Sequence, residues 1–146
     1  KDTFELFGIE IRLELINDFG LWKQTVLDAP ARFDFLILGL YHTLRESDGS
    51  YVDPENAAFW TGANSRLPVF GFWDFSVGRN AAIGGYVLSG ESMGREAGLL
   101  VKRILAGKAA GSVFMKEGEF VFSRSQLDRW KIPLPENIRS KSVFVE

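Results

Sequence analysis

The sequence predicts an α/β fold, with three layers (αβα) built around a mostly parallel sheet. Apolar runs of strand length alternate with amphipathic helical segments along the chain, which is the pattern of α/β domains. The run "FDFLILGLY", Phe33–Tyr41, is apolar almost throughout, as in strands that helices cover on both faces. A hydrophobic content of 46% and a charged content of 25% over 146 residues suit a single soluble globular domain.

The first elements follow strand, helix, strand order. Residues 9–15, "IEIRLEL", alternate apolar and charged side chains, and this period of two predicts a strand buried on one face. Asp18 is a typical N-cap residue for a helix through Asp28, which Pro30 ends. Phe33–Tyr41 supplies the next strand. Consecutive strands joined by a helix are predicted to lie parallel in a right-handed unit.

The middle of the chain is predicted to hold a loop, a short helix and two further strands. Residues 43–53 are rich in turn formers and predict a surface loop. Asp53 can cap a helix whose first residue is Pro54, a position that proline favours. The apolar stretches Leu67–Trp73 and 83–89, "IGGYVLS", then predict the third and fourth strands.

The next helix carries complete boundary signals. Ser89 can cap its amino terminus, and Glu91 lies in its first turn. Lys102 and Arg103 lie in its last turn, where the helix dipole favours cations, and Gly107 follows its end.

The last part of the chain predicts smaller elements. "SVFMKEGEFVFS" is typical of two short strands around Glu117 and Gly118, and Ser123 with Gln126 forms a capping-box pattern for the helix "SQLDRW". The segment "KIPLPENI" contains two prolines, so the chain is predicted to finish extended.

Composition does not favour nucleic acid or a membrane as a partner, and it removes cysteine chemistry. The 17 basic and 19 acidic side chains leave a net charge of -2, so no global field favours nucleic acid or an anionic membrane. Cysteine is absent, which removes disulfides, thiolate nucleophiles and cysteine metal sites. No apolar run approaches the roughly 20 residues that cross a bilayer. Residues 1–20 contain no signal peptide, so an exported protein is expected to have lost its leader.

Catalytic and metal-binding motifs are not found. His42 is the only histidine, and its sequence neighbours form no triad or metal pattern, so a loop or pocket-lining role is favoured. The acidic residues Asp48, Asp53 and Glu55 lack the spacing of a calcium loop. No glycine-rich segment fits a phosphate loop or a dinucleotide fingerprint. The sequence therefore predicts a protein that is not an enzyme, with no cofactor and no metal.

Aromatic and polar side chains gather where the predicted strands end. Ligands of open parallel sheets bind in the crevice beyond the carboxyl ends of the strands. Phe70 and Phe72 fall inside the third strand and are predicted to belong to the core. Trp73 and Asp74 fall just past it, and for them a ligand contact and an ordinary surface position both stay open. The residues expected to converge on one rim are Tyr41, His42, Trp73, Asp74, Tyr86 and Ser89.

Several motifs also resemble a known family. "PVFGFWD" before a glycine-rich "GGYVLS" strand, the helix "GREAGLLVKRILAG" and the closing segment "LDRWKIPLP" are similar to the carboxyl-terminal half of ABC-transporter substrate-binding proteins with the type I periplasmic-binding fold. The similarity covers nearly the whole chain, and each motif alone is only moderately specific. Related domains also serve as extracytoplasmic sensors in front of histidine kinases.

The resemblance implies a fold, a site and partners. Such proteins clamp a small organic ligand between two α/β lobes, and the amino-terminal lobe would be missing here. Residues 1–89 would form the carboxyl-terminal lobe, and residues 90–146 a crossover helix and tail that contact the missing lobe. The partner would be an ABC permease or a sensor kinase module, in the periplasm or another extracytoplasmic compartment. The cleft-facing residues implied are Tyr41, His42, Trp73, Asp74, Phe75, Tyr86 and Ser89.

One of these residues departs from the family pattern. Asp74 matches the aspartate that ends the "GFD" strand of sugar-binding relatives, but Trp73 is an extra residue in front of it, which leaves the direction of the carboxylate open.

The crossover helix also raises a question of assembly. Without the missing lobe, its apolar stripe would either fold back on its own sheet or pair with a second copy in a homodimer. The stripe consists of Met93, Ala97, Leu100, Val101 and Ile104.

Two other classes of function stay open. A small flavodoxin-like enzyme or receiver-type domain would use Asp74 as its reactive carboxylate, although the acidic pair of a receiver is missing after the first strand. An interaction module would use the aromatic rim as a docking surface.

Overall fold

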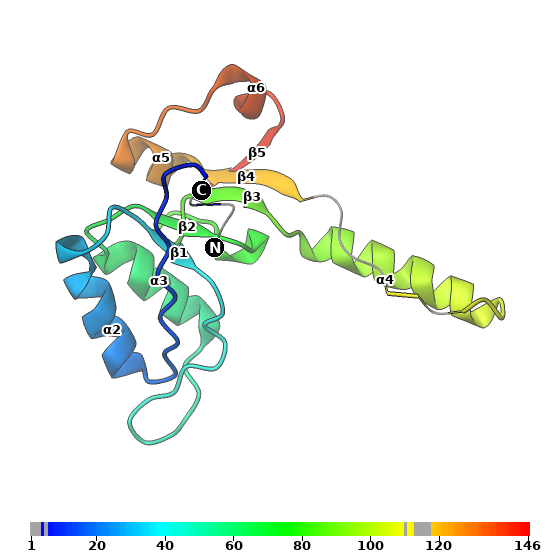
Figure 1. Ribbon diagram of the computed structural model, residues 1–146, viewed down its shortest axis with the longest axis horizontal. Helices are drawn as coiled ribbons and strands as arrows, with labels where there is room; N and C mark the ends of the chain where they lie inside the picture. Colours follow the sequence, from blue (N-terminus) through cyan, green and yellow to red (C-terminus); the bar gives the residue numbers. More distant parts are fainter. Residues whose placement is uncertain (1–3, 5, 110, 113–117) are drawn as a thin grey trace.

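The computed structural model describes residues 4, 6–109, 111–112 and 118–146, and it is a mixture of helices and short strands (Figure 1). The strands are β1 (Leu36–Leu38), β2 (Val69–Gly71), β3 (Gly84–Val87), β4 (Glu119–Ser123) and β5 (Ser142–Val145). The main helices are α2 (Phe19–Asp28), α3 (Pro54–Asn64), α4 (Gly90–Leu105), α5 (Arg124–Trp130) and α6 (Glu136–Arg139). Short 3₁₀ turns lie at Ala29–Ala31 and Asp74–Ser76.

The strands pair in two groups. β1 and β2 are parallel, β3 is antiparallel to β4, and β4 is parallel to β5. β3 lies beside β2, and just before β3 the Ile83 N–H donates to the Val69 carbonyl at 2.7 Å. The chain therefore has the mixed α/β character that its sequence predicts. The three-layer arrangement and the mostly parallel sheet stay predictions.

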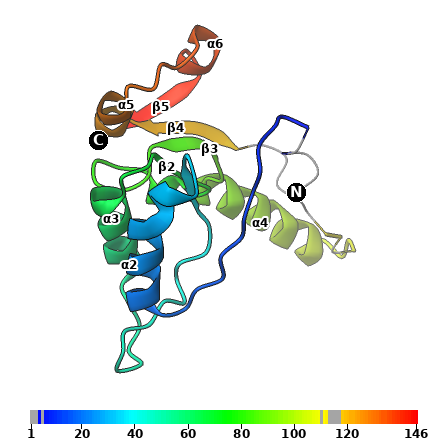
Figure 2. The same ribbon diagram turned by 60° about the vertical axis from the view of Figure 1, so that its left-hand side comes forward.

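The core lies between β1, β2 and the helix pair α2 and α3, which stand side by side in both views (Figures 1 and 2). Leu38 and Val69 contribute the apolar faces of the two strands, and Ala57 and Ala58 let α3 approach closely. The Trp22 indole donates to the Thr61 hydroxyl at 2.8 Å, which ties α2 to α3.

The caps predicted for these helices are confirmed. Asp18 accepts a hydrogen bond from the Leu21 N–H at 2.6 Å, and Asp53 accepts one from the Glu55 N–H at 2.8 Å. Residues 43–53 form no helix or strand, as predicted, and run as a loop between β1 and α3. β1, β2 and β3 are shorter than the predicted strands, because only their centres find hydrogen-bonded neighbours.

α4 confirms the predicted helix but contacts little of the part of the chain that the structure describes. Ser89 caps it, and Figure 1 shows it extending away from the other elements. None of its residues is buried, and its apolar side chains include Val101 at 52% and Ile104 at 46% exposed. No described helix is long and apolar enough to cross a bilayer.

The strand predicted at residues 9–15 is wrong. The segment is extended, but its Leu13 and Leu15 side chains are 80% and 87% exposed, and it pairs with no described strand. Among the described residues, a backbone hydrogen bond to a distant segment comes only after it, where the Arg45 N–H donates to the Asn17 carbonyl. An alternating pattern forms a strand only when a sheet edge supplies hydrogen bonds and a surface for its apolar face.

The extended carboxyl-terminal end is confirmed only in part, because the chain ends in the strand β5 but the short helix α6 interrupts it. Pro135 stands at the N-cap of α6, where proline costs no hydrogen bond, and β5 then pairs with β4. Of the two short strands predicted around Glu117 and Gly118, the second is confirmed as β4, and the first lies outside the described residues.

The capping box at α5 forms by half. The Ser123 hydroxyl accepts from the Gln126 N–H at 3.3 Å, as predicted. The Gln126 side chain does not return to the Ser123 N–H, because its Oε1 accepts from the Trp130 indole at 3.2 Å and the Ser123 N–H donates to the Ile83 carbonyl at 2.8 Å.

Candidate functional site

Four aromatic rings form a continuous row beyond the carboxyl ends of β1 and β2. Tyr41 stacks on His42 with ring centroids 4.7 Å apart, and His42 meets Phe75 edge to face at 5.5 Å. Phe75 then stacks on Trp73 at 5.8 Å. These four residues, called the aromatic row below, come from the segments that follow the two parallel strands. The structure thus brings together four of the seven side chains that the family resemblance implies for the cleft.

The row is buried at its Tyr41 end and open in its middle. Tyr41 is only 1% exposed, so it supports His42 from the core side and offers no surface to a ligand. Burial raises the pKa of the Tyr41 hydroxyl, and the charge of Glu55 raises this pKa further. His42 is exposed, and Phe75 is 59% exposed, so these two rings present the accessible faces.

Trp73 adds a buried hydrogen-bond donor. Its side chain is half-buried, and its indole Nε1 is shielded from solvent with no acceptor among the described residues. An unpaired buried donor costs about 1–3 kcal/mol, a cost that an approaching carbonyl or hydroxyl oxygen would relieve. The backbone beside it is fixed, since the Leu88 N–H donates to the Phe72 carbonyl at 2.8 Å and Leu88 accepts from Asp74 at 3.2 Å.

Asp74 is held against the amino terminus of α4. Its Oδ1 accepts from the Phe75 N–H at 2.8 Å, and its Oδ2 accepts from the Gly90 N–H at 3.0 Å. Each carboxylate oxygen has a second lone pair that no described donor uses. Because this carboxylate already complements the positive end of the helix dipole, the site favours hydroxyl or ammonium donors over a second anion.

The other two predicted residues have separate surroundings. Ser89 is 3% exposed and serves α4, because its hydroxyl accepts from the Ser92 N–H at 3.4 Å. Tyr86 is 57% exposed, and its ring lies 4.8 Å from the ring of Phe120 on β4. Among the described residues Tyr86 makes no ring contact with the aromatic row.

Phe72 corrects a core prediction. It is 49% exposed, because β2 ends at Gly71 and the chain leaves the sheet there. Phe70, its partner in that prediction, is partly buried and packs edge to face on Phe35 at 5.9 Å.

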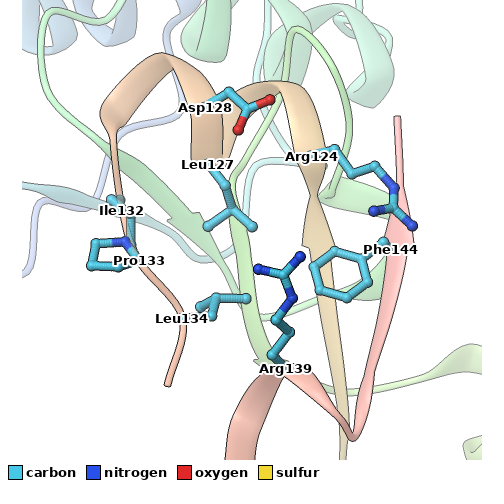
Figure 3. Close-up of a pocket in the computed structure, with 8 residues that line it drawn as sticks. All are labelled: Arg124, Leu127, Asp128, Ile132, Pro133, Leu134, Arg139 and Phe144. Atoms are coloured by element: carbon cyan, nitrogen blue, oxygen red, sulfur yellow. The ribbon is translucent and has the colours of Figure 1, made fainter. Parts of the chain in front are cut away.

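Two surface hollows lie away from the aromatic row. One, of about 730 Å³, lies over α2, α3 and the preceding loop, with Phe19, Tyr51 and Trp60 among its walls. The other, of about 200 Å³, lies between α5, α6 and β5 (Figure 3). Sequence reasoning missed both, because their residues come from elements whose association no local motif encodes. No group of three or more metal-ligating side chains occurs within the described part of the chain.

Comparison with known proteins adds no family. No family model, no curated protein and no solved structure matches the chain.

Proposed function

We propose that the chain is a small-molecule-binding module, one lobe of a type I periplasmic-binding fold with three layers and a mostly parallel sheet. In this proposal it is not an enzyme. It belongs to an extracytoplasmic substrate-binding protein or to the input domain of a sensor, whose partner is an ABC permease or a kinase module. The motifs around β2, β3, α4 and α5 support the family, and the aromatic row supports the binding function.

The observation that carries the proposal is the aromatic row next to the Asp74 carboxylate. His42 and Phe75 offer exposed ring faces beyond the ends of parallel strands, the usual place for a ligand. A ligand ring would stack there, while Asp74 accepts a hydrogen bond from a hydroxyl or ammonium group. The indole N–H of Trp73 has no acceptor among the described residues, so it is a further donor for a ligand oxygen. The ligand class is therefore a small organic molecule with a flat or ring-shaped body and at least one hydrogen-bond donor.

A second lobe would complete the site. Because the aromatic row is open on one side, it can bury only part of a ligand's surface, whereas sites that bind tightly bury most of it. A ligand that bridges two lobes stabilises the closed state by its higher affinity for that state. The exposed apolar side chains of α4 support a partner at the same end of the molecule, either the second lobe or a second copy of the chain.

The test is a titration followed by NMR, which detects the weak binding expected of a half-site. Representative amino acids, monosaccharides and purine nucleosides are added to the chain, and shifts are mapped at the aromatic row. Phe75→Ala and Asp74→Asn should each weaken binding by about 1–3 kcal/mol, since one removes the stacking face and the other the charge. Asparagine has one oxygen, which can accept from the Gly90 N–H but not also from the Phe75 N–H, so circular dichroism of Asp74→Asn is recorded beside its affinity to check that α4 persists.

Phe72→Ala is the matched control, because Phe72 is similarly exposed, lies three residues away and does not belong to the aromatic row. It should leave affinity unchanged. Binding that maps to the row but is indifferent to both Phe75→Ala and Asp74→Asn would overturn these roles. Saturable shifts elsewhere, with none at the row, would overturn the site.

A further inference from the structure

The hollow between α5, α6 and β5 has a composition unlike that of the aromatic row. Its walls are apolar, with Leu127 from α5, Leu134 from the segment after it and Phe144 from β5. Two arginines reach the same space, Arg124 from the start of α5 and Arg139 from the end of α6. Figure 3 shows the guanidinium of Arg139 lying among Leu127, Leu134 and Phe144.

Neither arginine has an anionic partner in the described part of the chain. The ion pairs there involve Arg12, Arg32, Arg79 and Arg95, and no side-chain hydrogen bond uses Arg124 or Arg139. The guanidinium carbon of Arg124 lies 4.6 Å from the centroid of the Phe144 ring, a cation–π contact. The only carboxylate in the wall is Asp128, and Figure 3 places it at the opposite end from the Arg139 guanidinium.

The segment that forms the hollow has a net positive charge, like the two arginines in its wall. Residues 124–141 contain five basic and two acidic side chains, although the whole chain has a net charge of -2. This excess of positive charge around a partly apolar hollow raises the local concentration of anions. The guanidinium group also binds carboxylates and phosphates in a bidentate geometry, with two donors aligned to two oxygens.

We propose that this hollow binds a small organic anion: a carboxylate or phosphate monoester that carries a compact apolar body. The charged head meets Arg139 and Arg124, and the body lies against Leu127, Leu134 and Phe144. The volume of about 200 Å³ is below the roughly 300–1,000 Å³ of sites for drug-sized ligands, so the ligand is about the size of one ring with a short acidic arm. This site is separate from the aromatic row and prefers the opposite charge.

The experiment titrates the 146-residue chain with phenylacetate, phenyl phosphate and the neutral isostere phenylacetamide, and follows leucine methyl and backbone NMR signals. Phenylacetate or phenyl phosphate should give saturable shifts at Leu127 and Leu134, with the amide at least roughly tenfold weaker. Arg139→Gln should weaken anion binding by a similar factor. Arg139→Lys keeps the charge but loses the planar guanidinium, so its anion affinity should lie between those of the unmodified chain and Arg139→Gln.

Arg103→Gln is the matched control, because it removes the same charge from the exposed last turn of α4. It should leave the affinity unchanged. Arg139 is exposed, so circular dichroism is expected to show the same fold for all variants. No saturable shift at Leu127 and Leu134, or equal binding of the amide, would mean that the arginines only cover apolar surface, and would overturn the proposal. Equal weakening by Arg103→Gln would also overturn it, because the attraction would then be diffuse. None of these outcomes depends on the aromatic row.

Discussion

The helices α3 and α4 are both capped at their amino termini and both predicted from the sequence. They differ in burial, because α3 packs into the core and α4 extends from it as an exposed arm. α3 buries Ala57, Ala58, Thr61 and Gly62 against the strands and α2, whereas α4 buries no residue. α3 is also the less amphipathic of the two in sequence, because small residues form much of its buried face. The comparison shows that a clear apolar stripe predicts a helix, but not whether the rest of the same chain covers that stripe.

Two isoleucines give the largest expected difference. Ile83, the residue before β3, is fully buried, whereas Ile104 on α4 is 46% exposed. Ile83→Ala should lower the free energy of unfolding by about 2–5 kcal/mol, since it removes buried methyl groups and leaves a cavity. Ile104→Ala should change it by less than about 0.5 kcal/mol, as exposed substitutions do. Urea unfolding of both variants at low protein concentration measures the difference.

The same pair also tests the arm for a partner. If Ile104→Ala lowers the free energy of unfolding as much as Ile83→Ala does, the apolar side chains of α4 are buried against other residues in solution. A cost that appears only at high protein concentration, together with a larger sedimentation coefficient, would identify the partner as a second copy of the chain. A cost independent of concentration would mean that α4 folds back on the rest of its own chain, contrary to the exposed arm of Figure 1.

Local signals account for the parts of the fold that the sequence predicted. Asp18, Asp53, Ser89 and Ser123 each accept a hydrogen bond from a backbone N–H within three residues, so the helix starts can be read without tertiary structure. The segment 9–15 has an equally clear pattern and forms no strand, because strand formation needs a neighbour that local sequence does not encode.

Two glycines sharpen the comparison between the helices. A Cβ on Gly62 of α3 would overlap the carbonyl oxygens of Asn80 and Ala81, whereas a Cβ on Gly98 of α4 would meet nothing within 4 Å. Gly62→Ala should therefore destabilise the chain by about 1–3 kcal/mol, because the rigid backbone must shift. Gly98→Ala should favour the helix by up to about 1 kcal/mol.

The measurements for these two variants differ, because α4 is not part of the core. Gly62→Ala is followed by global unfolding in urea. Gly98→Ala is followed by amide hydrogen exchange along α4, where slower exchange without a change in global stability is expected for an arm that opens on its own. Faster exchange along α4 in Gly98→Ala would contradict the open space around Gly98 and indicate a close neighbour there.

The sequence predicted where the residues of the candidate site lie, but not which of their side chains are exposed. Strand ends placed Tyr41, His42, Trp73 and Asp74 together, because the carboxyl ends of β1 and β2 meet at one edge. The sequence could not distinguish the buried Tyr41 from the exposed His42 beside it, since both follow the same apolar run. It also missed Arg124 and Arg139, which the fold brings to one hollow from two different helices.

The smallest expected effect concerns the buried end of the aromatic row. Because burial and Glu55 raise the pKa of Tyr41 in the folded chain, unfolding lowers this pKa toward its ordinary value of about 10 and releases a proton at higher pH. The contribution of Tyr41 to stability is therefore complete below pH of about 10 and is lost as the pH rises through the folded pKa. Tyr41→Phe should reduce the loss of stability as the pH rises above about 10, and it should leave the free energy of unfolding at neutral pH within about 1 kcal/mol, because the ring stays in place.

Glu55→Gln should reduce this alkaline loss of stability less than Tyr41→Phe does, since burial remains as the larger cause of the raised Tyr41 pKa. Urea unfolding at several alkaline pH values measures both slopes, and an unchanged slope in Tyr41→Phe would mean that the Tyr41 hydroxyl is open to water and that the row is exposed along its whole length.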